Sequence, residues 1–273
     1  MGGLAATLAG IHLTALPMII HIPVALAAGF IGGGLWGLLV GWLKVRFGAN
    51  EIITTVMLNY VAMYFVSFLV TGPMKAPPGN YPESRHVAES AILPTLLPGT
   101  RLHIGLLVAL AAILFYFIFM WKMKVGYEMR VVGRNMTASR YAGMKPEKMM
   151  ILAMFIAGGM GGLAGSIEIL GIQERLLQGF SPGYGFDGIA VSLVGLNSPI
   201  GIVLGAMLFG VLRAGGNMMQ MIAQVPLAII YIIQALVIIL VISGQMFQFS
   251  ERKRMLAMVG EQTDSTSEEG GEQ

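Results

Sequence analysis

The chain alternates long apolar stretches with short polar ones. A hydrocarbon core roughly 30 Å thick is crossed by about 20 helical residues. The stretches that approach this length with few charges are 18–43, 51–70, 103–121, 149–171, 200–216 and 226–243. A shorter stretch, 184–196, is rich in glycine, and residues 1–16 form an apolar stretch of their own. We therefore predict an all-α, polytopic transmembrane helix bundle of about seven or eight membrane segments, one of them broken.

Composition agrees with this prediction and excludes other classes of protein. Hydrophobic residues make up 56% of the 273 residues and charged residues 11%, whereas about 25% of residues are charged in soluble domains. The chain has no cysteine, which excludes disulfides within it and thiol chemistry. Residues 1–16 carry no charged flank and no cleavage site, so we expect no signal peptide. A helix that begins at residue 1 without a flank predicts that the chain lacks its true N-terminus or uses a late start.

The distribution of lysine and arginine predicts the orientation. The segment 122–148 holds seven basic residues and two acidic ones, which makes it the best cytoplasmic segment under the positive-inside rule. Threading the spans outward from this segment places Lys44 and Arg46 inside as well. The same threading places the loop 71–102 outside.

The last membrane segments admit two topologies. If 184–196 crosses the membrane, the basic residues 252–254 lie inside; if it only re-enters, they lie outside. A crossing places all three basic clusters on the cytoplasmic side. We therefore favour a crossing, by a broken helix. We therefore expect one transmembrane domain over 1–245, followed by 246–273 as a cytoplasmic and largely disordered tail.

A stripe of polar residues lies along the second long apolar stretch. Glu51, Thr54, Thr55 and Asn59 have the spacing of one helical face. One interpretation is local: Asn50 caps the helix, the acid favours the positive end of the helix dipole, and the hydroxyls bond back to the backbone. The other is a packing surface or a substrate pathway, because a carboxylate that faces lipid is costly. The sequence leaves both open.

A second acid, Asp187, heads the glycine-rich segment 184–196 much as Glu51 heads its own. On the predicted topology the two segments run in opposite directions, as inverted repeats of transporters do around a midplane site. The alternative is another acid at a helix start. The candidate pathway or gate residues are Asn50, Glu51, Thr54, Thr55, Asn59 and Asp187.

Small residues recur every four positions in several of the spans. This small-xxx-small pattern lets two membrane helices approach closely. The glycines that we predict to pack in this way are Gly29, Gly33, Gly37, Gly41, Gly158 and Gly162. The pattern indicates a compact bundle and does not indicate a substrate.

Motifs of enzyme chemistry are missing from the sequence. It has no P-loop, no His-Glu-x-x-His motif and no Gly-x-Ser-x-Gly elbow. The four histidines lie at span ends or in the loop 71–102 without ligand spacing, so we expect surface or interfacial histidines rather than metal ligands. We predict that the chain is not an enzyme and that it binds no metal.

The segment between the third and fourth spans has the residues of a short helix. Asn135 can cap a helix that runs through Ala142, Gly143 can end it, and Pro146 with Glu147 can start the next one. The result is a two-turn helix on the cytosolic surface. The alternative is a basic connector that only fixes the topology.

Four stretches resemble one family of membrane proteins. GRNMTASRYAG (133–143) resembles the coupling loop of ABC-importer permeases in the group for simple sugars, nucleosides and branched-chain amino acids. GANEIITTVMLNY (48–60) resembles the corresponding segment of the nucleoside branch, and SPGYGFDGIAV (181–191) and SPIGIVLGA (198–206) agree with it. The resemblance covers about residues 1–245.

The resemblance implies a permease subunit of an ABC importer that forms a pathway for nucleosides and couples to a separate ATP-binding subunit. It also implies a related second permease subunit, an external substrate-binding lipoprotein and a multi-pass location in the plasma (inner) membrane. No nucleic-acid partner and no cofactor of the chain's own are expected, because ATP binds the partner subunit. Met136 stands where family members usually have proline.

The residues implied to contact the ATPase are Gly133, Asn135, Ala138, Arg140, Tyr141, Ala142 and Gly143. Two alternatives stay open at this point. One is an ABC permease for simple sugars such as ribose. The other, from a different class, is a secondary transporter driven by an ion gradient, which would not need the short cytosolic helix.

Overall fold

The computed structural model describes residues 1–240 except positions 78, 80, 98, 182, 225, 227, 230, 234, 237 and 238. In this part of the chain the regular structure is helical, and five helices are long and apolar enough to cross a membrane. The prediction of an all-α membrane bundle is confirmed. The predicted span 226–243 falls partly, and the predicted tail 246–273 wholly, outside the described residues, so both stay predictions.

The five long helices correspond to predicted spans. They are α2 (Met18–Phe47), α3 (Glu51–Thr71), α4 (Gly105–Lys122), α7 (Pro146–Glu168) and α9 (Pro199–Ala223). α7 continues into a π-helical turn, η2 (Ile169–Gln173). The shorter helices of the described residues are α1 (Gly2–His12), η1 (Glu89–Ala91), α5 (Lys124–Arg134), α6 (Met136–Tyr141) and α8 (Tyr184–Val194).

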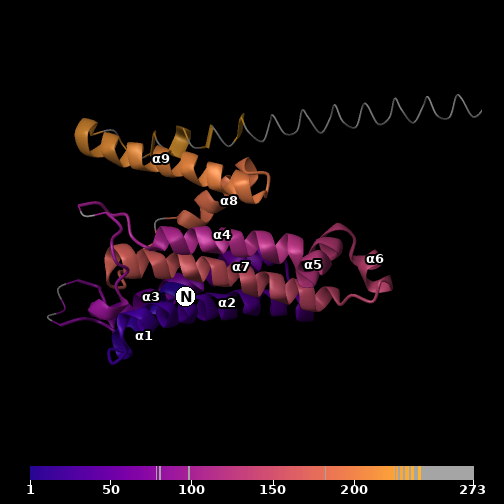
Figure 1. Cartoon of the computed structure of the whole chain (residues 1–273), viewed down its shortest axis with the longest axis horizontal. Helices are drawn as coiled ribbons and strands as arrows, with labels where there is room; N and C mark the ends of the chain where they lie inside the picture. Colours follow the sequence, from indigo (N-terminus) through magenta and orange to yellow (C-terminus); the bar gives the residue numbers. More distant parts are fainter. Residues whose placement is uncertain are drawn as a thin grey trace, which may run out of the picture. The chain divides into compact units, whose positions relative to one another are not determined.

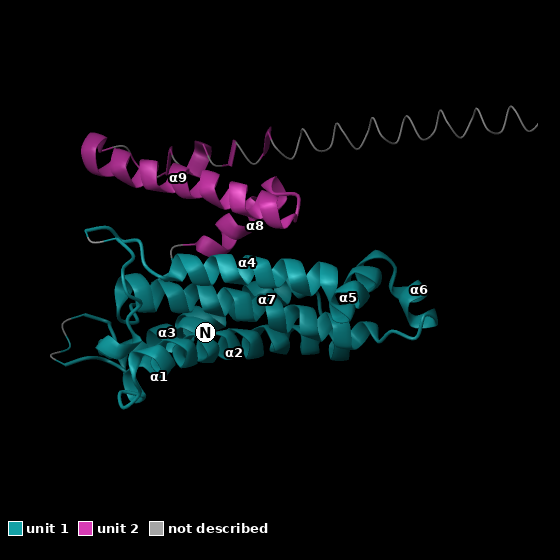
Figure 2. Cartoon of the chain, viewed as in Figure 1, with its two compact units in different colours: residues 1–182 teal, residues 183–273 magenta. Residues whose placement is uncertain are grey.

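The chain divides into two compact units, Met1–Pro182 and Gly183–Gln273 (Figure 2). In the first unit α2 and α7 lie side by side, α1 packs against both, and α5 and α6 lie together at one end (Figure 1). In the second unit α8 packs against α9. The domain bounds expected from the sequence, 1–245 and 246–273, stay predictions.

Glycines bring the backbones of α2 and α7 into direct contact. A Cβ atom at Gly33 would overlap the carbonyl oxygen of Gly158, and a Cβ atom at Gly162 would overlap the carbonyl oxygen of Gly29. Only glycine permits this approach, which gains dispersion contacts that larger side chains would prevent. The predicted packing glycines that face the other helix across this interface are Gly29, Gly33, Gly37, Gly41, Gly158 and Gly162.

The segment between α3 and α4, residues 72–104, covers the other end of the first unit, and we name it the cap segment. Its Val87 and Leu93 are buried in one core with Leu170 and Leu176, which belong to η2 and the chain after it. The Leu93 N–H donates to the Leu170 carbonyl at 2.9 Å. The cap segment is therefore part of the packed structure of this unit.

Two buried histidines correct the expectation of surface or interfacial histidines. His21 is fully buried, and its ring nitrogens lie 2.8 Å from Ser90 Oγ and 3.2 Å from the Ala9 carbonyl, so it joins α2 to the cap segment and α1. His103 is also buried, and its Nδ1 accepts from the Gly105 N–H at 3.1 Å. The expectation was wrong for these two because the cap segment folds back over the helix ends.

Replacing Gly162 by alanine should force α2 and α7 apart, whereas the same replacement at Gly161 should not. A Cβ atom at Gly161 would have no atom within 4 Å, and alanine favours a helix over glycine by up to ~1 kcal/mol. We expect Gly162→Ala to lower the free energy of unfolding by about 1–3 kcal/mol, as overpacking does, and Gly161→Ala to leave it unchanged or raise it. Thermal unfolding of both variants in one detergent measures the difference. Equal stability of the two would contradict the backbone contact.

Candidate functional site

A short helix, α6, joins α5 to α7 at one end of the first unit (Figure 1). The Asn135 Oδ1 accepts from the Ala138 N–H at 3.0 Å and so caps the start of α6. Gly143 has a φ of +77°, which suits glycine at the end of a helix, and α7 begins at Pro146. Met136 is the first residue of α6. Proline is common at the first position of a helix because the N–H that it lacks would have no partner within the helix there. Methionine and proline therefore both fit the same cap.

The buried side of α6 carries a small residue, and its outward side is exposed. Ser139 is fully buried, and its hydroxyl donates to the Met136 carbonyl at 2.7 Å. Arg140 forms an ion pair with Glu147 of α7 across the intervening turn. Tyr141 is 90% exposed, so the fold of this chain does not need its ring. The predicted contact residues that are all exposed here are Gly133, Asn135, Ala138, Arg140, Tyr141, Ala142 and Gly143.

The helix before α6 was not predicted from the sequence. α5 is amphipathic, and its Gly126 packs against the Phe119 carbonyl, so α5 folds back against the end of α4. The Arg130 guanidinium lies 4.5 Å from the centre of the Trp121 ring, a cation–π contact. The signal for this helix was available in the i, i+4, i+7 spacing of Val125, Met129 and Val132.

The polar stripe of α3 is largely satisfied by its own helix and by α2. Lys44 Nζ donates to Glu51 Oε1 at 2.6 Å, and the Asn50 Oδ1 accepts from the Ile52 N–H at 3.0 Å. The Thr54 hydroxyl donates to the Asn50 carbonyl and the Thr55 hydroxyl to the Glu51 carbonyl, both at 2.8 Å. These contacts are those of the local interpretation, a capped helix start.

Asn59 is the member of the stripe with the weakest contact among the described residues. Its side chain is exposed, and among the described residues its amide makes one long contact, from Nδ2 to Met63 Sδ at 4.0 Å. A carboxamide within a membrane helix needs partners. Asn59 is therefore available to a ligand or to a neighbouring subunit.

Asp187 of α8 forms an ion pair with Arg213 of α9. The same guanidinium lies 4.4 Å from the centre of the Tyr184 ring. Ionisable groups in membrane segments usually pair in this way because an unpaired charge in hydrocarbon is costly. Arg213 was not predicted as a site residue, although its charge within the apolar stretch 200–216 was a signal for a partner.

A second polar group that was not predicted lies where α7 passes into η2. Gln173 Nε2 donates to Glu168 Oε1 and to the Phe180 carbonyl, both at 3.0 Å. Close to it in the sequence, Gln178 Nε2 donates to Ser67 Oγ of α3 at 2.8 Å. Glu168 was visible in the sequence as a carboxylate within the predicted span 149–171, but its partners were not.

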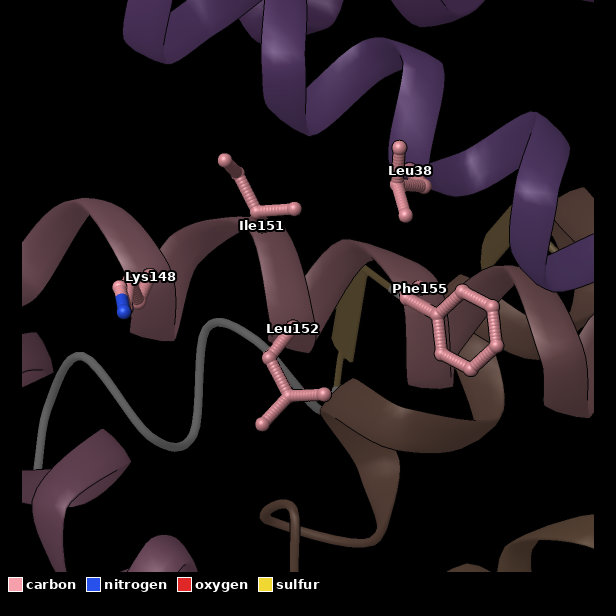
Figure 3. Close-up of a pocket in the computed structure, with 5 residues that line it drawn as sticks. All are labelled: Leu38, Lys148, Ile151, Leu152 and Phe155. Atoms are coloured by element: carbon pink, nitrogen blue, oxygen red, sulfur yellow. The ribbon is translucent and has the colours of Figure 1, made fainter.

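An open groove of about 360 Å³ lies on the surface of α2 and α7 (Figure 3). It is lined by Leu38 of α2 and by Lys148, Ile151, Leu152 and Phe155 of α7. A site for a polar solute needs several placed donors and acceptors, and this groove offers one charged side chain. It is therefore a poor candidate for the substrate pathway. Among the described residues no group of three or more histidines and acids is placed to hold a metal ion.

Comparison with known proteins identifies the family. Residues 1–242 match the family described as branched-chain amino acid transport system, permease component. The chain belongs to this family. It is a transport permease, and with its long apolar helices it is a multi-pass protein of the cell membrane.

Three relatives show the range of the similarity. A glucose ABC transporter permease protein of Haloferax volcanii is 36% identical over 91% of this chain and 68% of its own length. A guanosine ABC transporter permease protein of Bacillus subtilis is 38% identical over 85% of this chain and 68% of its own length. A nucleoside ABC transporter permease protein of Lactococcus lactis is 34% identical over 73% of this chain and 57% of its own length. No solved structure matches the chain.

Loss of Arg213 should destabilise the second unit more than loss of the whole Asp187–Arg213 pair. In Arg213→Gln the Asp187 carboxylate stays in a membrane segment without its cation, which we expect to lower the free energy of unfolding by on the order of 2 kcal/mol. The double variant Asp187→Asn/Arg213→Gln keeps the shapes and removes both charges, so it should recover most of this loss. Urea or thermal unfolding in detergent measures the free energy of unfolding of each variant in this double-mutant cycle. Additive losses in the double variant would show that the two charges do not interact.

Proposed function

We propose that this chain is the permease subunit of an ATP-driven nucleoside importer and that α6 receives a separate ATP-binding subunit. The exposure of α6 carries this proposal: a two-turn helix, capped at Asn135, presents Tyr141 with 90% of its surface free. Buried aromatic anchors dominate the binding energy of protein interfaces. A tyrosine that its own fold leaves uncovered suits such an anchor.

The construction of α6 also suits the transmission of movement. The Arg140–Glu147 ion pair joins α6 to the first turn of α7, and the buried Ser139 hydroxyl bonds within α6 to the Met136 carbonyl. α7 in turn contacts α2 through backbone atoms at Gly33 and Gly162. A displacement of α6 is therefore transmitted to the membrane helices through short connections. For transport, ATP and substrate must each stabilise a different one of the inward and outward states.

The positive-inside rule supports a cytosolic position for this contact. α5, α6 and the start of α7 carry the basic residues of the segment 122–148. ATP would bind the partner subunit, since the chain has no P-loop. The resemblance to ABC permeases supports two more partners: a related second permease subunit and an external substrate-binding lipoprotein.

Nucleosides are the proposed substrates because two relatives are named for guanosine or nucleoside transport. Simple sugars are the second candidate, since a glucose permease is similar at 36% identity. On the pathway we place Asn59, which is exposed on α3, and Asp187, which pairs with Arg213. Asn50, Glu51, Thr54 and Thr55 support the start of α3 at the cytosolic end of this pathway.

Tyr141→Glu should abolish ATP-driven uptake while the chain stays in the membrane. A carboxylate in place of the ring removes an apolar anchor and must be desolvated at the interface, so we expect recovery of the ATP-binding subunit with the tagged chain to fall at least about tenfold. Tyr141→Phe keeps the ring and should retain the partner. Tyr81→Glu makes the same change at a tyrosine of the cap segment that is 71% exposed and should also retain it. Full recovery with Tyr141→Glu would remove α6 as the contact.

Uptake by the assembled transporter in proteoliposomes tests the substrate and the energy source together. We expect labelled guanosine to enter only with ATP, to be displaced by other nucleosides and not by glucose or ribose, and to be insensitive to ionophores that collapse ion gradients. Displacement by the sugars at equal concentration would favour the sugar permease. Uptake that follows an ion gradient without ATP would favour the secondary transporter.

A further inference from the structure

We infer that Glu168 and Gln173, at the π-helical end of α7, bind the hydroxyl groups of the transported solute, which for a nucleoside are the vicinal hydroxyls of its ribose. The inference rests on the proposed function and adds to it a named contact for the substrate. The observations behind it are hydrogen-bond acceptors that have no partner among the described residues of this part of the fold.

The amide of Gln173 has a fixed orientation and an unused oxygen. Its Nε2 donates to Glu168 Oε1 and to the Phe180 carbonyl, each at 3.0 Å. Both partners are acceptors, so the NH₂ group and not the oxygen must face them. The Gln173 Oε1 is buried and has no hydrogen-bond partner among the described residues. Buried polar atoms without partners are rare and call for an explanation.

The Glu168 carboxylate is unusual among the acids of the membrane helices. Glu51, Glu147 and Asp187 each form an ion pair with a lysine or arginine, whereas no ion pair of the described residues includes Glu168. Its hydrogen bond to Gln173 occupies one of several acceptor positions. A carboxylate at the end of a membrane helix without a cation is costly to keep, which favours a functional reason for it.

The backbone holds this pair in place. The π-helical turn Ile169–Gln173 places Gln173 beside Glu168, and turns of this kind are frequent at functional sites. Ile169 and Leu170 within the turn are fully buried, and the Gly171 backbone lies against the His103 ring. The two acceptors are therefore preorganised, as binding groups of a site must be.

The Glu168–Gln173 pair favours ligands that donate hydrogen bonds. A carboxylate and an amide carbonyl side by side offer two acceptors and no free donor, which suits two neighbouring hydroxyl groups. A metal ion would require more oxygen ligands than these two side chains supply. On the positive-inside orientation this end of α7 lies on the outer side, next to the cap segment, where a delivered solute enters first.

The test compares Glu168→Gln with Glu174→Gln in the complete transporter. Glutamine at position 168 keeps the size of the side chain and can still accept from Gln173, so its unfolding temperature should match that of the unchanged chain. Glu174 is the next acid along the chain, and Glu174→Gln removes the same charge from a side chain that is not one of the two proposed to bind the solute. The substrates are guanosine and 2′,3′-dideoxyguanosine, which lacks both hydroxyls.

We expect Glu168→Gln to lower guanosine uptake at least about tenfold, the effect of losing a hydrogen bond to a charged group, and to change dideoxyguanosine uptake less than about twofold. Glu174→Gln should change neither. The preference of the binding protein is the same in all samples and cancels in the comparison. An equal loss for both substrates, or no loss, overturns the inference. No guanosine uptake by the unchanged chain instead overturns the nucleoside proposal.

A second measurement does not depend on transport. The chain has no cysteine, so Ile172→Cys, at a side chain of η2 that is 46% exposed, introduces a single reactive thiol beside the pair. Guanosine should slow its alkylation by a maleimide in the assembled transporter, and dideoxyguanosine should not. Adding Glu168→Gln should remove the protection. Equal rates with both nucleosides in the otherwise unchanged chain contradict a hydroxyl contact here.

Discussion

The direct backbone contact between α2 and α7 is the constraint on which the first unit depends. Because Gly33 meets Gly158 and Gly162 meets Gly29, the two helices lie too close for any side chain larger than hydrogen at these points. Lipid offers no hydrophobic drive for helices to associate, so close packing of this kind supplies much of the stability. One end of α7 then carries α6, and the other end carries the Glu168–Gln173 pair.

Three ion pairs lie where helices of this chain meet. Lys44–Glu51 closes the turn between α2 and α3, Arg140–Glu147 joins α6 to α7, and Asp187–Arg213 lies within the second unit. Each pair fixes a junction of helices and lowers the cost of charge at a membrane. The polar groups that the chain leaves unused are few among the described residues, which is why Asn59 and Gln173 stand out as contacts for something else.

The sequence predicted what depends on local pattern and missed what depends on distant partners. The long helices followed from apolar length, and α6 followed from the cap at Asn135 and the glycine that ends it. The burial of His21 did not follow, since its partners Ser90 and Ala9 reach it only when the cap segment folds back. Glu168 was visible as an acid in a span, but its pairing with an amide and not with a cation needed the π-helical turn.

The most direct test of the account is whether α6 touches an ATP-binding subunit. In a chain without cysteine, Thr137→Cys places one thiol on the exposed side of α6 and can carry a photoactivated crosslinker in native membranes. We expect a covalent adduct with an ATP-binding protein, and no such adduct from Tyr81→Cys in the cap segment. Adducts of Thr137→Cys with lipid alone, or the ATP-binding protein captured from Tyr81→Cys instead, would contradict it.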